Sequence, residues 1–244
     1  MNKLFSWAGR PVLNSILVTI LFLIVVGAGG AVSMMTGLDS RITLLIAYLL
    51  MAVGLGWVIF RKKRWIDFGF PSGRAAEKAK VYRYIPLFLM ALLPLVVGLS
   101  TDLKWTDIGF VVGFMAVVAF VEETIFRGIV LKLLQTKGNL VAILGSSLLF
   151  SGSHALNALA GKDWMQTSFQ IAFALLAGVI LATLMIQTNN ILPLILYHFV
   201  NNTVSSITRS DIEASLSLTI SVAVLAIGIV DAIWLSMPKR RKAS

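Results

Sequence analysis

The chain of 244 residues contains no cysteine, and charged residues make up only 13% of it. The lack of cysteine excludes a disulfide framework, a thiolate metal site and a cysteine nucleophile. The shortage of charge argues against an ordinary soluble domain, in which roughly 25% of residues are charged. What the chain has instead is 58% hydrophobic residues and a mean hydropathy of +0.89. Lipid can cover a surface that has so little charge, so the composition predicts an integral membrane protein.

Apolar segments long enough to cross a bilayer recur along the whole chain. A helix needs about 20 apolar residues to span the hydrocarbon, and candidate spans lie at residues 12–35, 41–60, 82–99, 108–133, 139–156, 166–187, 191–207 and 214–236. The first is longer than a typical signal-peptide core and further spans follow, so we interpret it as a transmembrane helix. Pro86 and Pro94 should kink the third span, and the seventh is short. We see neither linker nor repeat and predict one transmembrane domain over 1–244, an all-α polytopic helix bundle with about eight transmembrane helices.

Lysine and arginine are distributed very unevenly between alternate loops. With the N-terminus placed inside, 16 of the 21 basic residues fall in inside segments, and Arg127 lies within a span. The outside loops hold the remaining four, which are Arg41, Lys104, Lys162 and Arg209. Because cytoplasmic segments carry the excess of basic residues, both termini are predicted to be cytoplasmic, in a multi-pass protein of the cell membrane. The net charge of +10 then reflects topology and contact with anionic lipid, and no nucleic-acid partner is expected.

The fourth span carries two carboxylates and a guanidinium in the sequence FVEETIFRG. Glu123 and Arg127 are four residues apart, so they share a helical face and can pair, which reduces the cost of burying both. Glu122 lies about 100° around the helix from Glu123. The positions three and four residues after it are Ile125 and Phe126, so its own helix offers it no cation. This pattern leaves Glu122 available for chemistry, the alternative being an ion-pair cluster that only locks helices together.

The only two histidines of the chain both lie inside apolar spans. Phe150 and His154 share a face at the end of the fifth span, and His198 and Asn202 share one in the seventh. Asn201 is a nearby alternative to Asn202 and points about 100° away. Each pair alone also fits a satisfied core histidine or interhelical hydrogen bonding. Together with the two glutamates, however, these costly intramembrane groups indicate a functional site.

The three motifs resemble those of the CPBP family of intramembrane endopeptidases, which comprises type II CAAX prenyl proteases, bacteriocin-processing proteins and Abi proteins. The family pattern is E-E-x-x-x-R, F-x-x-x-H and H-x-x-x-N on successive membrane helices, and all three occur here in that order. The resemblance covers about residues 105–208, which we expect to form the catalytic core. It implies an endopeptidase that cleaves a membrane-associated or hydrophobic peptide or protein.

The resemblance also implies a role for each motif residue. Glu122 corresponds to the general base that activates water, and His154 to its partner in holding that water. His198 and Asn202 correspond to the donors that stabilise the oxyanion. The remaining three have supporting roles: Glu123 and Arg127 as a pair, and Phe150 as a packing or wall residue.

A metal is not favoured by the sequence. The chain has no H-E-x-x-H helix, and its two histidines come from different spans. A glutamate-activated water needs no metal, so we expect no cofactor. If zinc were bound instead, its ligands would be Glu122, His154 and His198.

Two other classes of function remain as alternatives. One is a non-catalytic bacteriocin-immunity or partner-binding protein on the same scaffold. The other is a proton-coupled transporter with Glu122, His154 and His198 as a relay, although the chain shows no evident inverted repeat. For a peptidase, the candidate substrates are a prenylated C-terminal peptide, a leader peptide, and a bacteriocin or signalling-peptide precursor. Asp231, in the last span, has no partner motif and is expected to be structural or to snorkel.

Overall fold

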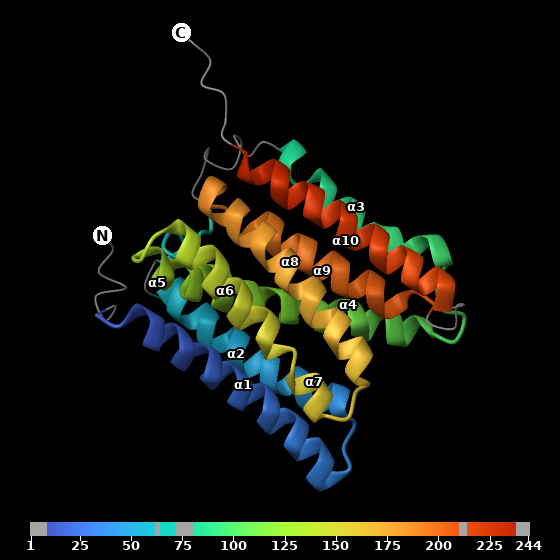
Figure 1. Ribbon diagram of the computed structural model, residues 1–244. Coiled ribbons are helices and arrows are strands. Elements are labelled where there is room, and N and C mark those ends of the chain that lie inside the picture. The colour runs from blue at the N-terminus through green and yellow to red at the C-terminus, as the bar shows by residue number, and fades with distance from the viewer. Residues whose placement is uncertain (1–8, 62–63, 72–80, 210–213, 238–244) are drawn as a thin grey trace.

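The computed structural model describes residues 9–61, 64–71, 81–209 and 214–237, and in these residues it contains helices and no strand. The helices pack side by side into an elongated bundle (Figure 1). Their bounds are α1 Pro11–Thr36, α2 Ser40–Arg61, α3 Ile85–Leu92, α4 Trp105–Glu123, α5 Leu131–Gln135, α6 Asn139–Ser153, α7 Leu156–Leu159, α8 Trp164–Thr188, α9 Leu192–Ile207 and α10 Ala214–Ser236. The predicted all-α class is confirmed.

Six stretches of helix are long and apolar enough to cross a membrane, counted over the residues that the structure describes. They contain α1, α2, α4 with α5, α6, α8 and most of α10. The two other predicted spans form shorter helices, at Ile85–Val97 and Leu192–Ile207. A multi-pass membrane bundle is therefore confirmed, whereas the number of eight crossings stays a prediction.

The two prolines of the predicted third span act differently from one another. Pro86 lies in the first turn of α3, where a missing backbone N–H breaks no helical hydrogen bond. Pro94 lies in the first turn of the 3-10 segment Leu93–Val97, which continues α3 with tighter winding. Only Pro94 therefore interrupts a helix, and the expected kink at Pro86 is absent.

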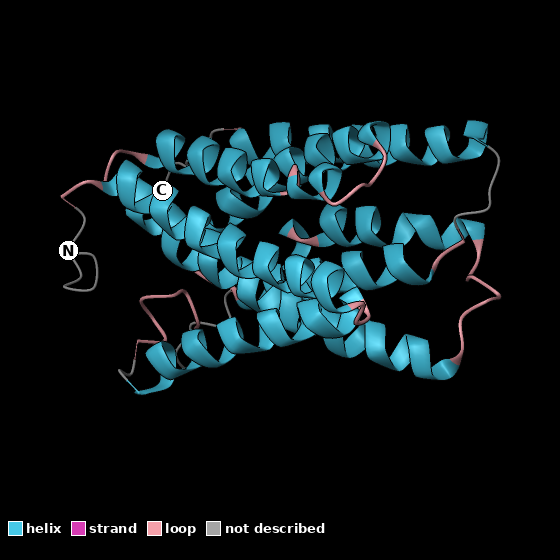
Figure 2. Cartoon of the chain, turned by 90° about the horizontal axis from the view of Figure 1, so that it is seen from below, coloured by secondary structure: helices cyan, strands magenta, loops and turns pink. Residues whose placement is uncertain are grey.

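The bundle has two ends, which we name the basic end and the opposite end. At the basic end α1 begins and α10 finishes (Figures 1 and 2), and the Ile191 N–H donates to the Gly69 carbonyl across 2.9 Å. At the opposite end the Ser100 N–H donates to the Ile207 carbonyl, also across 2.9 Å. An even number of crossings fits this arrangement. The cytoplasmic location of the termini, whose residues 1–8 and 238–244 lie outside the described part, stays a prediction.

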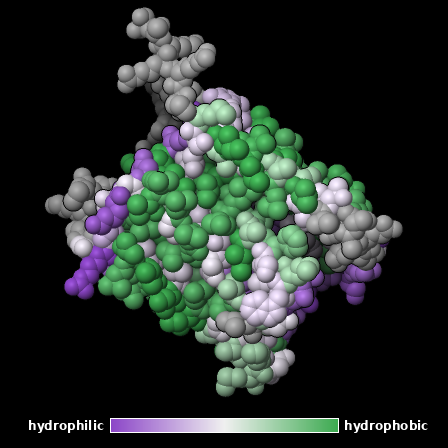
Figure 3. Space-filling model, in the orientation of Figure 1, coloured by the Kyte–Doolittle hydropathy of each residue, from purple (hydrophilic) through white to green (hydrophobic). Residues whose placement is uncertain are grey.

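The outer surface of the bundle suits a bilayer. Figure 3 shows hydrophobic residues over the middle of the visible face and hydrophilic residues towards its margins. Trp105 and Trp164 are strongly exposed at the opposite end, and Trp57, Trp65 and Trp234 are exposed at the basic end. Tryptophan is enriched where a membrane meets water, so the two groups indicate where the two interfaces lie.

Close packing in the middle of the bundle depends on small side chains. Gly178 of α8 lies so near α6 that an added Cβ would be 3.1 Å from the Cβ of Ser147. Small residues at such contacts let membrane helices approach each other closely. The contact holds α8 against α6, and these two helices carry Gln170 and, at the end of α6, His154.

Candidate active site

The helix that carries both glutamates changes its winding directly after them. The Leu131 N–H bonds to the carbonyl of Phe126, five residues back, and Thr124–Val130 form a π-helical turn. Such turns are rare and are found frequently at functional sites. All side chains from Thr124 to Arg127 are buried. The length of the apolar run predicted one helical span over 108–133 and did not indicate this turn.

Glu123 is enclosed in the protein and pairs with Arg127, as the spacing predicted. The Arg127 Nη1 lies 2.9 Å from Glu123 Oε1, and the two side chains are 1% and 0% exposed. The same carboxylate oxygen lies 2.8 Å from the Nδ1 of His198. A carboxylate can only accept, so Nδ1 carries a proton and donates it to this bond. Glu123 thereby fixes the orientation of the His198 ring.

Glu122 faces away from this ion pair and towards a cavity. Its Oε1 accepts a hydrogen bond of 2.6 Å from the hydroxyl of Tyr48 on α2. Its Oε2 lies 3.6 Å from the Nε2 of His198, which is too long for a hydrogen bond. Arg127 bonds to Glu123 and not to Glu122. The sequence analysis missed Tyr48, although the need of a buried tyrosine hydroxyl for a partner was a signal.

The cavity has a volume of about 520 Å³ and brings the predicted catalytic residues together. Glu122, His154, His198 and Asn202 all line it, and so does Phe150. Glu123 and Arg127 are not among its lining residues. Further polar side chains of the wall are Tyr48, Asn157, Lys162, Gln170, Tyr197, Asn201, Ser205 and Ser206. The motifs thus divide into a layer that lines the cavity and a packed layer behind it.

His154 directly follows the last residue of α6 and is held by a chain of amides. The Nε2 of Gln170 lies 3.4 Å from His154 Nδ1. The Nδ2 of Asn157 donates to Gln170 Oε1 across 2.8 Å. Because the Gln170 oxygen already accepts from Asn157, its nitrogen is free to donate to Nδ1, which leaves the proton of a neutral His154 on Nε2. Sequence reasoning missed both Gln170 and Asn157, which belong to no motif.

Phe150 separates the ion pair from the cavity. The Cζ of Arg127 lies 4.3 Å from the centroid of the Phe150 ring, a cation–π geometry. The same ring meets those of His154 and His198 edge-on, with centroids 5.2 and 5.9 Å away. Phe150 therefore contacts both histidines and the arginine.

Asn201 and Asn202 both reach the cavity. The Nδ2 of Asn201 donates to Asn202 Oδ1 across 3.3 Å, which leaves the Asn202 amide nitrogen as a donor for another group. Asn201 also lines a second, smaller cavity. The two asparagines are therefore both candidates for contact with a substrate.

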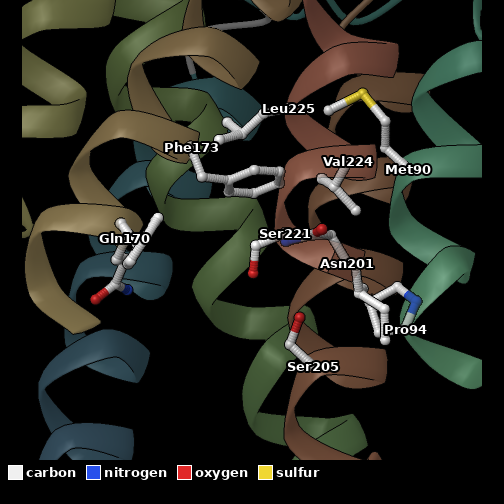
Figure 4. Close-up of a pocket in the computed structure, with 11 residues that line it drawn as sticks. Met90, Pro94, Gln170, Phe173, Asn201, Ser205, Ser221, Val224 and Leu225 are labelled. Carbon is white, nitrogen blue, oxygen red and sulfur yellow. The ribbon is translucent and has the colours of Figure 1, made fainter. Parts of the chain in front are cut away.

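A smaller cavity of about 250 Å³ adjoins the first and shares its wall residues Gln170, Phe173, Asn201 and Ser205. It lies between α3, α8, α9 and α10. Figure 4 shows Asn201, Ser205 and Ser221 below the Phe173 ring, the apolar Met90 and Leu225 above it, and Val224 beside it. This side pocket suits an apolar group that enters from the larger cavity.

A metal site does not emerge from this arrangement. Among the described residues, no group of three or more histidine, aspartate or glutamate side chains is placed to hold an ion. The alternative zinc ligands Glu122, His154 and His198 share the cavity without forming such a group.

Comparison with known proteins agrees with the motifs. Residues 104–204 match the family model described as type II CAAX prenyl endopeptidase Rce1-like. This segment contains all three motifs, whereas Tyr48 lies outside it. Comparison with curated proteins finds no match. The matched family is one of membrane proteases, which implies a peptide or protein substrate. Over residues 104–204, this multi-pass membrane protein is therefore similar to the Rce1-like type II CAAX prenyl endopeptidases.

Proposed function

We propose that the protein is an intramembrane endopeptidase that hydrolyses peptide bonds with a water molecule activated by Glu122. One observation carries the proposal: of the two adjacent buried glutamates, Glu122 lines the cavity, and the other is bound to Arg127. A general base must be able to reach its substrate, and Glu122 meets this requirement.

The first step is attack by water on the scissile carbonyl. Glu122 takes a proton from a water molecule held between it and His154, and the remaining hydroxide forms a bond to the carbonyl carbon. Glu122 then gives the proton to the leaving amine as the carbon–nitrogen bond breaks. A positioned base of this kind contributes roughly 10²–10⁴ to the rate.

The negative charge that forms on the carbonyl oxygen needs donors. The Asn202 amide nitrogen supplies one donor, and Nε2 of His198 supplies the second. Since His198 already donates from Nδ1 to Glu123, donation from Nε2 requires that the ring carry both protons. Glu123 stabilises the resulting imidazolium, which gives this second carboxylate a function without contact with the substrate.

Tyr48 acts as a positioning residue. Its hydroxyl holds one carboxylate oxygen of Glu122 at 2.6 Å. The other oxygen is then directed at the water. A carboxylate fixed in this way loses less conformational freedom when the transition state forms.

The test compares purified wild type with Glu122→Gln in detergent, with and without a chelator, on a pooled library of hydrophobic peptides. Cleavage by wild type alone, unaffected by chelator, is the expected result. Full activity of Glu122→Gln would refute the mechanism. Loss of cleavage with chelator would instead reassign Glu122, His154 and His198 as metal ligands, and wild type without activity would favour a non-catalytic binding protein.

A further inference from the structure

The two ends of the bundle differ sharply in charge. Sixteen of the 21 basic residues belong to the segments before α1, from the last residue of α2 to the start of α3, around the end of α5, and after α10. All of these segments adjoin the basic end. The opposite end is flanked by Arg41, Lys104, Lys162 and Arg209, and acidic residues also occur there: Asp39, Asp102, Asp107 and Asp163.

The catalytic cavity reaches the surface at the opposite end. Lys162, Ser205 and Ser206 line it and are exposed. Lys162 belongs to the connection between α7 and α8, and the two serines lie in the last turn of α9. The end of α9 meets the segment before α4 there, through the bridge between Leu99 and Thr208.

Towards the basic end the cavity is closed by packed side chains. Phe126 and Leu131 of the π-helical turn and α5 are at most 1% exposed, and so are Leu184 and Leu194 of the neighbouring helices. Beyond this layer, Lys132 Nζ donates to the carbonyl of Asp67 across 2.6 Å. Among the described residues, the path from Glu122 to the basic end is therefore filled.

We infer that the catalytic cavity opens on the extracytoplasmic side of the membrane and receives hydrophobic peptide segments presented from that side. The excess of lysine and arginine sets the orientation of a membrane protein, with the basic end in the cytoplasm. The mouth of the cavity at the opposite end then faces outwards. That the occupant is a peptide rests on the proposed function, whereas the direction of the opening does not.

The inference narrows the class of substrate. A protein held on the cytoplasmic leaflet by a lipid anchor would meet the basic end, where the cavity is closed. An exported or membrane-inserted peptide reaches the mouth from outside. The side pocket beyond Phe173 can take an apolar side chain next to the cleaved bond. Precursors of secreted peptides have this combination of location and hydrophobicity, and cytoplasmic prenylated proteins do not.

The natural absence of cysteine permits a direct test of the direction. Ser205→Cys places a thiol at the mouth, and Gln135→Cys places a matched thiol at an exposed position of the basic end. Each variant is treated with a membrane-impermeant thiol reagent, in intact and in permeabilised cells. The inference expects Ser205→Cys to react in intact cells and Gln135→Cys only after permeabilisation. Any other pattern, including reaction of both in intact cells, overturns it.

A second measurement separates this inference from the proposed function. Gln135→Cys is reconstituted into phosphatidylglycerol–phosphatidylethanolamine vesicles, and an impermeant hydrophobic peptide pool is added to the medium. A molecule that does not react with external thiol reagent has its basic end inside the vesicle, so its cavity faces the medium according to the inference. The rate of cleavage should therefore increase in proportion to the fraction of these molecules. Cleavage that scales with the reactive fraction overturns the direction. If labelling in cells gives the expected pattern but no peptide is cleaved, the direction stands and the proposed function fails.

Discussion

The wall of the cavity and the packed layer behind it meet at two adjacent residues of α4. On the cavity side, Glu122 is bound by a neutral hydroxyl and faces open volume. Behind it, Glu123 binds Arg127 and His198 through one oxygen and has no exposed surface. The proposed function makes the same side chain a reactive group in one layer and a structural anion in the other. Because Glu122 and Glu123 lie on the same helix, the difference between their surroundings comes from neighbouring residues on α2 and α9.

The most direct test of this difference is to make the same substitution at Glu122 and at Glu123. Glu122→Gln should lower kcat by roughly 10²–10⁴ and leave the melting temperature near that of wild type. Glu123→Gln leaves Arg127 buried without a counter-charge, which should cost about 3–5 kcal/mol of stability. Peptide cleavage and thermal unfolding in detergent measure the two effects. Equal effects of the two variants on both readouts would remove the distinction between the layers.

The two asparagines offer a sharper comparison within the cavity wall. Asn202→Ala should lower kcat about 10²–10³-fold if it removes an oxyanion donor, with little change in KM. Asn201→Ala removes a wall residue that both cavities share and should act mainly through KM. The reverse pattern in steady-state kinetics would assign the donor to Asn201.

Tyr48 tests whether α2 takes part in catalysis. Tyr48→Phe removes one hydroxyl and should lower kcat about tenfold, the value of one net hydrogen bond of about 1.4 kcal/mol, with KM unchanged. Tyr84→Phe is the matched control, because it deletes a hydroxyl that bonds to Thr188 outside the cavity. A purely structural Tyr48 would lower stability and leave kcat of the folded enzyme unaltered.

The smallest effect is expected at the mouth. Lys162 is exposed and lines the cavity, so it can attract an acidic group of a peptide. Lys162→Ala should raise KM about two- to fivefold for peptides with an acidic residue near the cleaved bond, the size expected of an exposed ion pair. Peptides without acidic residues serve as controls, and high salt should reduce the difference. An equal change in KM for both sets would exclude charge recognition.

Local spacing and long-range contacts differ in how well the sequence reveals them. The pair of Glu123 with Arg127 follows from a separation of four residues on one helix, and hydropathy was sufficient for the membrane class. The contact of Tyr48 with Glu122 joins residues 74 positions apart, and only tertiary packing creates it. Gln170, which holds His154, was likewise missed because a single glutamine in an apolar helix has no characteristic pattern. The two short segments that contain Pro94 and Asn202 were predicted to be helical, but hydropathy did not establish that they cross the membrane.

The π-helical turn after Glu123 has a consequence for how the length of this helix can vary between related chains. A π turn holds one residue more than the α-helical turn it replaces. Because the wider turn absorbs this extra residue, deleting one residue within Thr124–Val130 would restore regular winding and leave the faces on both sides of the turn nearly unchanged. Deleting a residue from the regular part of the helix would instead rotate one half by about 100° against the other. Either the glutamates would then leave the cavity, or Leu131 and its neighbours would leave the core. Related chains that are one residue shorter in this helix should therefore lack the residue at this turn.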